Sequence, residues 1–443
     1  MTPSSTFTNN RASARRLPID LNLSHQVRSI ALINPLPDFG ISQYTYELAE
    51  GLASSGVQVD VYANGLARFE DADLPRRHRY FPVLGSLLLR QRGILRRGAQ
   101  RDDAAVRAAG PGERPASRTE PQPAGTNRRW RATARNWILT AELAWHLKRS
   151  RYDLVWTQWP DTEPGGEHFW SLVKRLGMRV AHTVHNVLPH EEQPGDARKC
   201  ASVYRACDVL FVHSAMALEE MGRSFPQVVG KTRVMHHGLY TLYPRRPNVR
   251  DAVRTRLGIE RDHVALLFFG GIRPYKNVDA VLAALAGECN PRAVLVVAGC
   301  ESGYPESVLG DPLGRTRHLA EQLGVGDRVR LLPGNLNVPE TADLFEAADV
   351  VILPYAKSYG SGALLLAMTF GKFIVATRTG GMDEYLRPYA AHDLLVSSET
   401  DEVAAGIERA IGQVSSGAGT RAAPMPDLQW SNIAKVALGL LRG

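Results

Sequence analysis

Short runs of apolar residues alternate along the chain with segments in which apolar residues recur every three or four positions. The first apolar run covers residues 29–33, a helical pattern follows at 41–54, and a second run covers 59–63. Continuous apolar runs are typical of strands that are buried on both faces. A strand, a helix and a strand at this spacing predict a βαβ unit and therefore a parallel sheet. Further strands are expected at 153–159, 179–186, 209–214 and 232–238.

A second series with the same alternation begins near residue 263. Its strands are expected at 264–269, 293–299, 328–334, 350–355 and 373–377. The predicted fold class is therefore α/β, with two doubly wound, Rossmann-like domains. The expected boundaries are a disordered tail at 1–27, a first domain at 28–240, a linker at 241–262, a second domain at 263–427 and a terminal helix at 428–443.

One segment interrupts the first series. Residues 81–98 mix leucines with four arginines, and residues 99–128 are rich in Ala, Gly, Pro and Arg. We therefore expect an insertion over about 85–130, with disorder in its second part. Two interpretations of residues 81–98 are open: an amphipathic segment that lies on an anionic membrane surface, or a core helix with a solvated basic face.

The charge and the cysteine content indicate which partners and which cellular compartment to expect. The formal charge is +8 and the pI is about 9.4, which favours acidic partners such as nucleotides. The basic segments lack interleaved aromatic residues, so nucleic acid is not an expected partner. The chain has four cysteines and no Cys-x-x-Cys pair, as expected in a reducing compartment. The first 28 residues contain no apolar core and no run approaches 18 apolar residues, so the expected location is cytoplasmic.

The turn after the strand at 264–269 carries the strongest candidate chemistry. Gly270 and Gly271 allow a tight turn, Arg273 and Lys276 follow, and Asn277 is the expected N-cap of the next helix. A helix N-terminus with a guanidinium and an ammonium group beside it is suited to a diphosphate. The alternative is an ordinary turn with two solvated cations.

Four segments of the second half resemble the family-4 glycosyltransferases of GT-B architecture. They are GGIRPYKN at 270–277, the stretch 331–355, SGALLLAMTFGKFIVAT at 361–377 and GGMDE at 380–384. The first half is similar more weakly, at 39–42 and 183–191. The resemblance implies two domains facing a cleft, with the terminal helix crossing back to the first. It also implies hexose transfer from a nucleoside-diphosphate sugar to a hydroxyl, with a lipid-linked saccharide or polysaccharide precursor as acceptor, on the inner membrane face.

The resemblance also assigns roles to single residues. On the donor side, Gly270, Gly271, Arg273, Lys276 and Asn277 would bind the diphosphate, and Gly334, Asn335, Tyr355, Ser361 and Gly362 would bind the nucleoside and ribose. His185 would face the donor sugar as the catalytic residue, either forming a hydrogen bond with a sugar hydroxyl or taking the acceptor proton. On the acceptor side the residues would be Gly40, His190 and Glu191. No metal or other cofactor is expected, because the two cations and the helix N-terminus would neutralise the leaving diphosphate.

The chain departs from the family at two positions. Typical members carry two glutamates with seven residues between them, and the aligned residues here are Ser358 and Leu366. This leaves open whether the reaction retains or inverts the anomeric configuration. Two alternatives to glycosyl transfer are therefore open. One is a non-catalytic subunit that binds nucleotide sugar and supports a partner enzyme, and the other is a sugar-nucleotide epimerase of the same fold. For His236 and His237 a structural role competes with a functional one, and Asp383 and Glu384 are expected to cap a helix.

Overall fold

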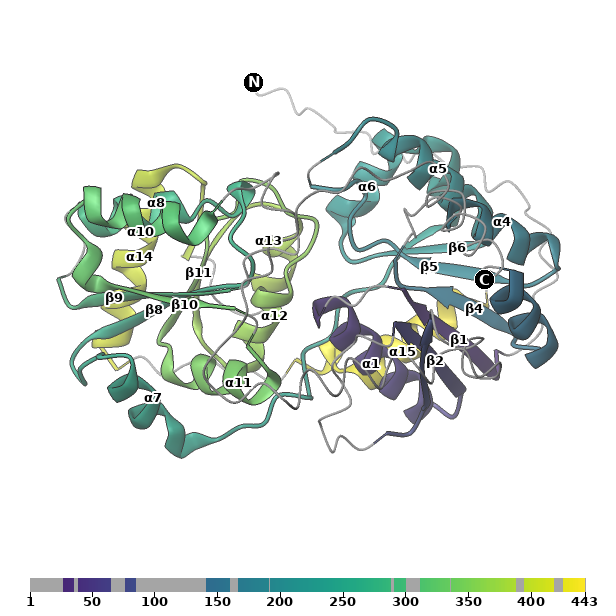
Figure 1. Cartoon of the computed structure of the whole chain (residues 1–443), viewed down its shortest axis with the longest axis horizontal. Helices are drawn as coiled ribbons and strands as arrows, with labels where there is room; N and C mark the ends of the chain where they lie inside the picture. Colours follow the sequence, from purple (N-terminus) through teal and green to yellow (C-terminus); the bar gives the residue numbers. More distant parts are fainter. Residues whose placement is uncertain are drawn as a thin grey trace, which may run out of the picture.

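The computed structural model describes residues 27–35, 39–64, 76–84, 141–159, 166–190, 192–287, 291–299, 311–334, 336–387, 394–417 and 425–442. These residues form two parallel sheets, each with helices on both faces (Figure 1). The predicted fold class is therefore confirmed. Nearly all of the expected tail, the whole of the expected insertion at 85–130 and two candidate site residues, Glu191 and Asn335, lie outside the described residues.

The first sheet has seven strands in the order β3-β2-β1-β4-β5-β6-β7. Alternate residues of β1 point to opposite faces, so Ile30 and Leu32 enter one core while Ala31 and Ile33 enter the other. The strands are β1 (Ser29–Asn34), β2 (Gln58–Asn64), β3 (Arg79–Leu84), β4 (Leu154–Thr157), β5 (Val180–Thr183), β6 (Val209–Val212) and β7 (Thr232–Val234). One face carries α1 (Phe39–Ser54) and α15 (Trp430–Leu440), and the other carries α4 (Gly166–Arg175), α5 (Asp196–Ala206), α6 (Ala215–Ser224) and a helix over 141–150.

The second sheet has six strands in the order β10-β9-β8-β11-β12-β13. They are β8 (Val264–Phe269), β9 (Ala293–Gly299), β10 (Val329–Pro333), β11 (Val350–Leu353), β12 (Phe373–Thr377) and β13 (Leu395–Val396). One face packs on α7 (Arg250–Arg256), α11 (Val338–Ala347) and α12 (Gly362–Thr369), and the other on α8 (Val278–Ala286), α10 (Pro312–Gln322) and α14 (Thr400–Ser415). The short α13 (Met382–Leu386) follows β12.

Two sequence-based expectations for the first sheet need correction. Residues 79–84 form the edge strand β3, paired in parallel with β2, so the start of the leucine- and arginine-rich segment belongs to the sheet. The remainder of that segment lies outside the described residues. The strand expected at 179–186 ends at Thr183, which places His185 in the loop after the strand rather than on it.

The C-terminal helix returns to the first sheet and packs along α1 (Figure 1). The backbone of Trp430 lies so close to Gly51 that a Cβ there would be 2.5 Å from the Trp430 carbonyl oxygen. The Trp430 ring covers Gly238 in the same way, because a Cβ at that position would be 2.7 Å from a ring carbon. Glycine is therefore required at both positions. In addition, the buried Glu47 of α1 accepts hydrogen bonds from the backbone N–H groups of Thr241 and Leu242.

Arg254 of α7 is a buried cation on which the edge of the second domain depends. Its side chain is 4% exposed, it pairs with Asp349 at 3.0 Å and it donates to the carbonyl oxygens of Glu260 and His263. Removing one member of a buried pair typically costs about 3–5 kcal/mol, and because Arg250 still pairs with Asp349 the lower part of that range applies here. We therefore expect Arg254→Ala to lower the melting temperature by roughly 6–15 °C in calorimetry.

The matched control is Arg261→Ala. Arg261 is 91% exposed and pairs with the exposed Asp251 at 3.2 Å, so its loss should leave the melting temperature within about 2 °C of the unmodified protein. Equal melting temperatures for the two variants would contradict the assigned role of Arg254.

Candidate functional site

The donor turn, residues 270–277, joins β8 to α8 at the carboxyl edge of the second sheet. Gly270 has a φ of 100°, in the left-handed region, and a Cβ there would be 2.7 Å from the Lys276 Nζ. A Cβ at Gly299, at the end of β9, would lie 2.1 Å from the Gly270 carbonyl oxygen. The turn therefore exists only because both positions are glycine, and this close packing brings Lys276 back over the end of β8.

Arg273 and Lys276 both lie in this turn, on either side of Pro274 and Tyr275. Residues 274–276 form a single 3-10 turn, and the Lys276 Nζ lies 5.4 Å from the centre of the Tyr355 ring. The Tyr275 carbonyl accepts a hydrogen bond from the Ala356 N–H at 2.7 Å, which ties the donor turn to the loop after β11. The structure thus places Lys276 near the Tyr355 ring, and Arg273 lies three residues earlier in the same turn.

Asn277 stands at the N-cap position of α8, as expected, but its side chain does not cap the helix. Asn277 has a φ of 54°, makes no side-chain cap and instead donates its amide to the Ser398 carbonyl at 3.0 Å. Its left-handed backbone turns the side chain away from the first N–H groups of α8, so the side chain joins the donor turn to the segment before α14. A role in diphosphate binding is not tested by this contact.

The start of α12 lies directly beside the donor turn. Ser361 caps α12 by accepting from the Leu364 N–H at 3.2 Å, and the Tyr355 phenol is hydrogen-bonded to the Ser361 side chain. Burial raises the pKa of Tyr355 well above its usual value, so the phenol stays protonated. Gly362 leaves room for the Tyr240 phenol, whose oxygen would lie 2.9 Å from a Cβ at that position.

The other donor-side residues are more dispersed. Gly334 follows β10 in a left-handed conformation, with a φ of 91°, and β10 is separated from β8 by β9. Leu366 is 2% exposed in the core beneath α12, and the Ser358 hydroxyl donates to the Gly360 carbonyl at 2.9 Å. Both positions at which relatives carry glutamate are thus engaged in packing or in a local turn.

Three histidines of the first domain meet at the carboxyl edge of its sheet. His185 follows β5, His213 follows β6 and His237 follows β7, and the ring of Tyr44 from α1 contacts all three, with centroid distances of 4.7, 5.3 and 4.9 Å. The His185 Nδ1 and the His213 Nε2 are 3.3 Å apart. Sequence reasoning singled out His185 and His237 but missed His213, whose only signal was its place at the end of a strand.

These histidines are neutral at physiological pH. Burial lowers the pKa of His213 to about 4 and that of His237 to about 3. The pKa of His185 lies well below its usual value, first because of burial and then because of the neighbouring histidines. The cluster is therefore a set of neutral donors and acceptors rather than a cationic site.

His190 connects the first domain to the donor turn. Its ring stacks on Tyr275, with centroids 4.2 Å apart and an angle of 15° between the planes. The acceptor-side candidate His190 is therefore in contact with the donor-side turn, while Gly40 lies exposed in the first turn of α1. Contacts between distant segments of this kind are not visible in a sequence.

The segment after Gly380 and Gly381 also joins the two domains. Glu384 accepts hydrogen bonds from the N–H groups of Ala215 at 3.1 Å and Met216 at 3.3 Å, at the N-terminus of α6. It therefore caps a helix of the first domain, and its carboxylate is 3.6 Å from the Nε2 of the exposed His236. Tyr385 extends this contact by donating to the His213 carbonyl and accepting from the His237 N–H.

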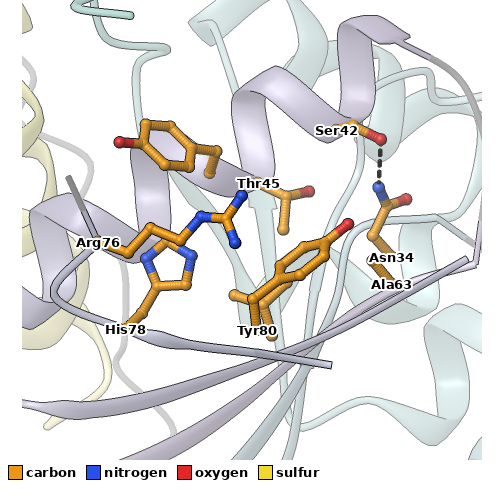
Figure 2. Close-up of a pocket in the computed structure, with 9 residues that line it drawn as sticks. Asn34, Ser42, Thr45, Ala63, Arg76, His78 and Tyr80 are labelled. Carbon is orange, nitrogen blue, oxygen red and sulfur yellow. Dashed lines mark hydrogen bonds between the residues drawn. The ribbon is translucent and has the colours of Figure 1, made fainter. Parts of the chain in front are cut away.

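A small pocket lies between α1 and the strands β2 and β3. Figure 2 shows the Arg76 guanidinium in the pocket beside the ring of Tyr80, with their centres 5.0 Å apart. The fully buried His78 side chain is held by Glu50, at 2.6 Å from its Nδ1. Burial alone would raise the pKa of Glu50, but the hydrogen bonds from His78 and the Arg77 N–H hold it below its usual value. The other lining residues are Asn34, Ser42, Thr45, Tyr46, Val61 and Ala63.

Sequence reasoning did not find this pocket. Its polar residues come from β1, α1, the segment before β3 and β3 itself, and no recognisable motif joins them. Arg76 and His78 precede an edge strand that the hydrophobic pattern did not reveal.

Among the described residues, one group of side chains could hold a metal ion. It consists of Glu260, Asp262 and His263, with one ligand atom of each within 4.8 Å of the others. These residues precede β8, at the opposite end of that strand from the donor turn. Within the same described part of the chain, no helix is both long enough and apolar enough to cross a membrane.

Two family models match the chain. The glycosyl transferase 4-like domain matches residues 39–236, and the glycosyl transferases group 1 match residues 249–414. The matched residues make up most of the chain and the fold is GT-B, so the chain belongs to the family-4-like glycosyltransferases. The resemblance inferred from the motifs is thereby confirmed.

Curated relatives match a part of the chain. D-inositol 3-phosphate glycosyltransferase of Streptomyces scabiei is 31% identical over 264 residues, which is 54% of this chain and 57% of the relative. The enzyme with the same name from Streptomyces avermitilis is 30% identical over 249 residues, which is 52% of each chain. The chain matches little more than half the length of these relatives.

Solved structures match nearly the whole fold. Anabaena HepE in complex with UDP-glucose superimposes with a TM-score of 0.59 at 15% identity, covering 94% of this chain and 95% of that chain. WaaG, a glycosyltransferase involved in lipopolysaccharide biosynthesis, superimposes with a TM-score of 0.55 at 17% identity, covering 93% of this chain and 95% of that chain. At these identities the likeness establishes the fold alone.

The contact between Glu384 and α6 should hold the two domains in the observed arrangement. Hydrogen bonds to a charged group contribute about 1.5–3 kcal/mol each, so Glu384→Ala should favour more open arrangements. We expect an increased radius of gyration in small-angle X-ray scattering. The control is Asp383→Ala, which removes a pair with Arg387 within the same helix and should leave the radius unchanged. The same radius for both variants would contradict the prediction.

Proposed function

We propose that this chain transfers a hexose from a nucleoside-diphosphate sugar to a hydroxyl group of an acceptor. In this reaction the acceptor oxygen bonds to the anomeric carbon, the bond from that carbon to the diphosphate breaks, and the nucleoside diphosphate leaves. The observation that carries the proposal is the donor turn, where Lys276 lies near the Tyr355 ring, Arg273 stands three residues earlier, and the Tyr355 phenol is hydrogen-bonded to Ser361 at the start of α12. Two fixed cations stabilise the charge that develops on the leaving group, so no metal is needed.

The proposal assigns the two sides of the reaction to the two sheets. Residues 263–427 hold the donor, with Gly270, Gly271, Arg273, Lys276 and Asn277 at the diphosphate, and Gly334, Asn335, Tyr355, Ser361 and Gly362 at the nucleoside. Residues 28–240 hold the acceptor, with His185 at the sugar and Gly40, His190 and Glu191 nearby. Residues 241–262 link the two, and 428–443 return to the first. The UDP-glucose complex of HepE supports a donor of this class.

For the acceptor, we propose a lipid-linked saccharide or polysaccharide precursor at the cytoplasmic face of the membrane. The arginines and leucines at 81–98 support contact with an anionic lipid surface. WaaG, which shares the fold, is involved in lipopolysaccharide biosynthesis.

The pocket beside α1 favours a second acceptor class, a phosphorylated polyol. Arg76 lines this pocket with a guanidinium, a group that binds phosphate, whereas Asn34 and Ser42 are hydrogen-bonded to each other and the Thr45 hydroxyl donates to the Ile41 carbonyl. The names of the Streptomyces relatives specify inositol 3-phosphate, an acceptor of this chemistry.

Ser358 and Leu366 keep a second function open, namely a non-catalytic subunit that binds nucleotide sugar and supports a partner enzyme. The same donor turn would serve that function. Tight nucleotide binding without turnover, with every acceptor offered, would favour the subunit over the enzyme.

The diphosphate assignment is tested by the double variant Arg273→Ala, Lys276→Ala. Each charged contact contributes about 1.5–3 kcal/mol, so affinity for nucleoside diphosphates should fall at least a hundredfold. Isothermal titration in buffer containing EDTA measures this without any metal contribution. Lys357→Ala is the control, because Lys357 is an exposed cation of the neighbouring loop, 4.0 Å from Glu192. If the double variant binds as tightly as this control, the donor turn is not the diphosphate site.

The variant Arg76→Ala distinguishes between the two proposed classes of acceptor. With a phosphorylated polyol as acceptor, loss of the guanidinium should raise the KM for the acceptor about tenfold or more, with little change in kcat. With a lipid-linked saccharide the KM should stay unchanged. Arg77→Ala is the control, because Arg77 is the exposed neighbour whose side chain does not line the pocket. An unchanged KM for every phosphorylated polyol would exclude the second class.

A further inference from the structure

The protonation of His213 is fixed by its backbone partner. The His213 Nδ1 lies 3.1 Å from the Met235 carbonyl oxygen, and the side chain is 4% exposed. A carbonyl oxygen can only accept a hydrogen bond, so the Nδ1 carries the hydrogen. Because the buried ring is neutral, the His213 Nε2 carries a lone pair and acts as an acceptor.

This protonation sets the tautomer of His185. The His213 Nε2 lies 3.3 Å from the His185 Nδ1, and since the former is an acceptor, the latter must donate. A neutral imidazole has one hydrogen, so the His185 Nε2 is left as a lone pair. That atom is buried and has no hydrogen-bond partner among the described residues.

The surroundings of His185 keep it neutral and in place. Tyr44 contacts the ring edge-on at 4.7 Å, and Trp159 lies nearly parallel to it at a centroid distance of 6.4 Å. The titratable neighbours that lower its pKa are His182, His213 and His237. Forming an imidazolium among buried imidazoles is unfavourable, which suits His185 to accepting a hydrogen bond rather than storing a proton.

We propose that His213 is a positioning residue that holds His185 in the tautomer with its hydrogen on Nδ1, so that the Nε2 accepts a hydrogen bond from a hydroxyl of the bound sugar. This inference rests on the proposed glycosyltransferase function for its ligand, but the tautomer itself does not depend on turnover. The chain of groups runs from the Met235 carbonyl through His213 to His185. His213 does not touch the sugar, and its effect is transmitted through His185.

The domain contact described above bears on the same chain of groups. The Tyr385 phenol donates to the His213 carbonyl and accepts from the His237 N–H, so α13 of the donor domain holds the backbone on both sides of the histidine cluster. The His213 imidazole is thus held through its Nδ1 by the carbonyl of Met235, the residue after β7. The His213 backbone is held by Tyr385 of the donor domain. The donor and His185 are therefore positioned by one connected set of contacts.

The test compares His213→Phe with His213→Gln. Phenylalanine fills the space but has no acceptor, whereas the glutamine amide oxygen can accept from the His185 Nδ1. Nitrogen NMR of histidine-labelled protein should show His185 protonated on Nδ1 in the unmodified protein and in His213→Gln, and a mixture of tautomers in His213→Phe. The variant His185→Gln assigns the signal. Melting temperatures establish that each variant is folded.

Kinetics give the second readout. We expect kcat to fall about tenfold in His213→Phe and less than threefold in His213→Gln, with the affinity for nucleoside diphosphate unchanged in both, because the donor turn is intact. A hydrogen on the His185 Nε2 in the unmodified protein would overturn the proposal, and so would equal tautomers and rates in the two variants. If the unmodified protein turns over no sugar nucleotide, the proposed function fails and the NMR comparison alone decides the tautomer.

Discussion

The ring of Tyr44 is the contact on which the acceptor half of the site depends. It is 1% exposed, and besides the three histidines it meets the ring of Trp430 edge-on at 5.2 Å. The histidines come from loops after three different strands, and such loops are held only by what packs against them. Tyr44 provides that packing from α1, and α1 is itself held by the returning helix α15. The last helix of the chain thus stabilises the site without contributing to its chemistry.

The donor half follows a different principle. Its cations are positioned by close backbone packing, because Gly270 and Gly299 allow the end of β9 to touch the turn after β8. Lys276 then lies near Tyr355, which hydrogen-bonds the residue that caps α12. Two glycines, one buried phenol and one helix cap therefore set where a diphosphate would bind.

Much of the fold could be predicted from the hydrophobic pattern. A continuous apolar run such as 264–269 is stable only as a strand buried on both faces, at the centre of a parallel sheet. Glycines mark where such runs end. The donor turn could be predicted for the same reason, because its residues are adjacent in sequence. The errors occurred where the local pattern was ambiguous. The edge strand β3 is half-exposed and preceded by arginines, and the backbone of Asn277 takes a conformation that its residue type permits but does not require.

By itself, the sequence determined the two series of strands and helices, the cationic turn and the family, because each depends on residues close together in the chain. Only the tertiary structure decided that His213 lies beside His185, that His190 stacks on the donor turn, that Glu384 caps a helix of the other domain, and that Arg76 and His78 line a pocket. Each of these joins segments tens to hundreds of residues apart. Parallel strands bring such segments to the same edge of a sheet, and the order of the strands and the packing between the domains decide which of them meet.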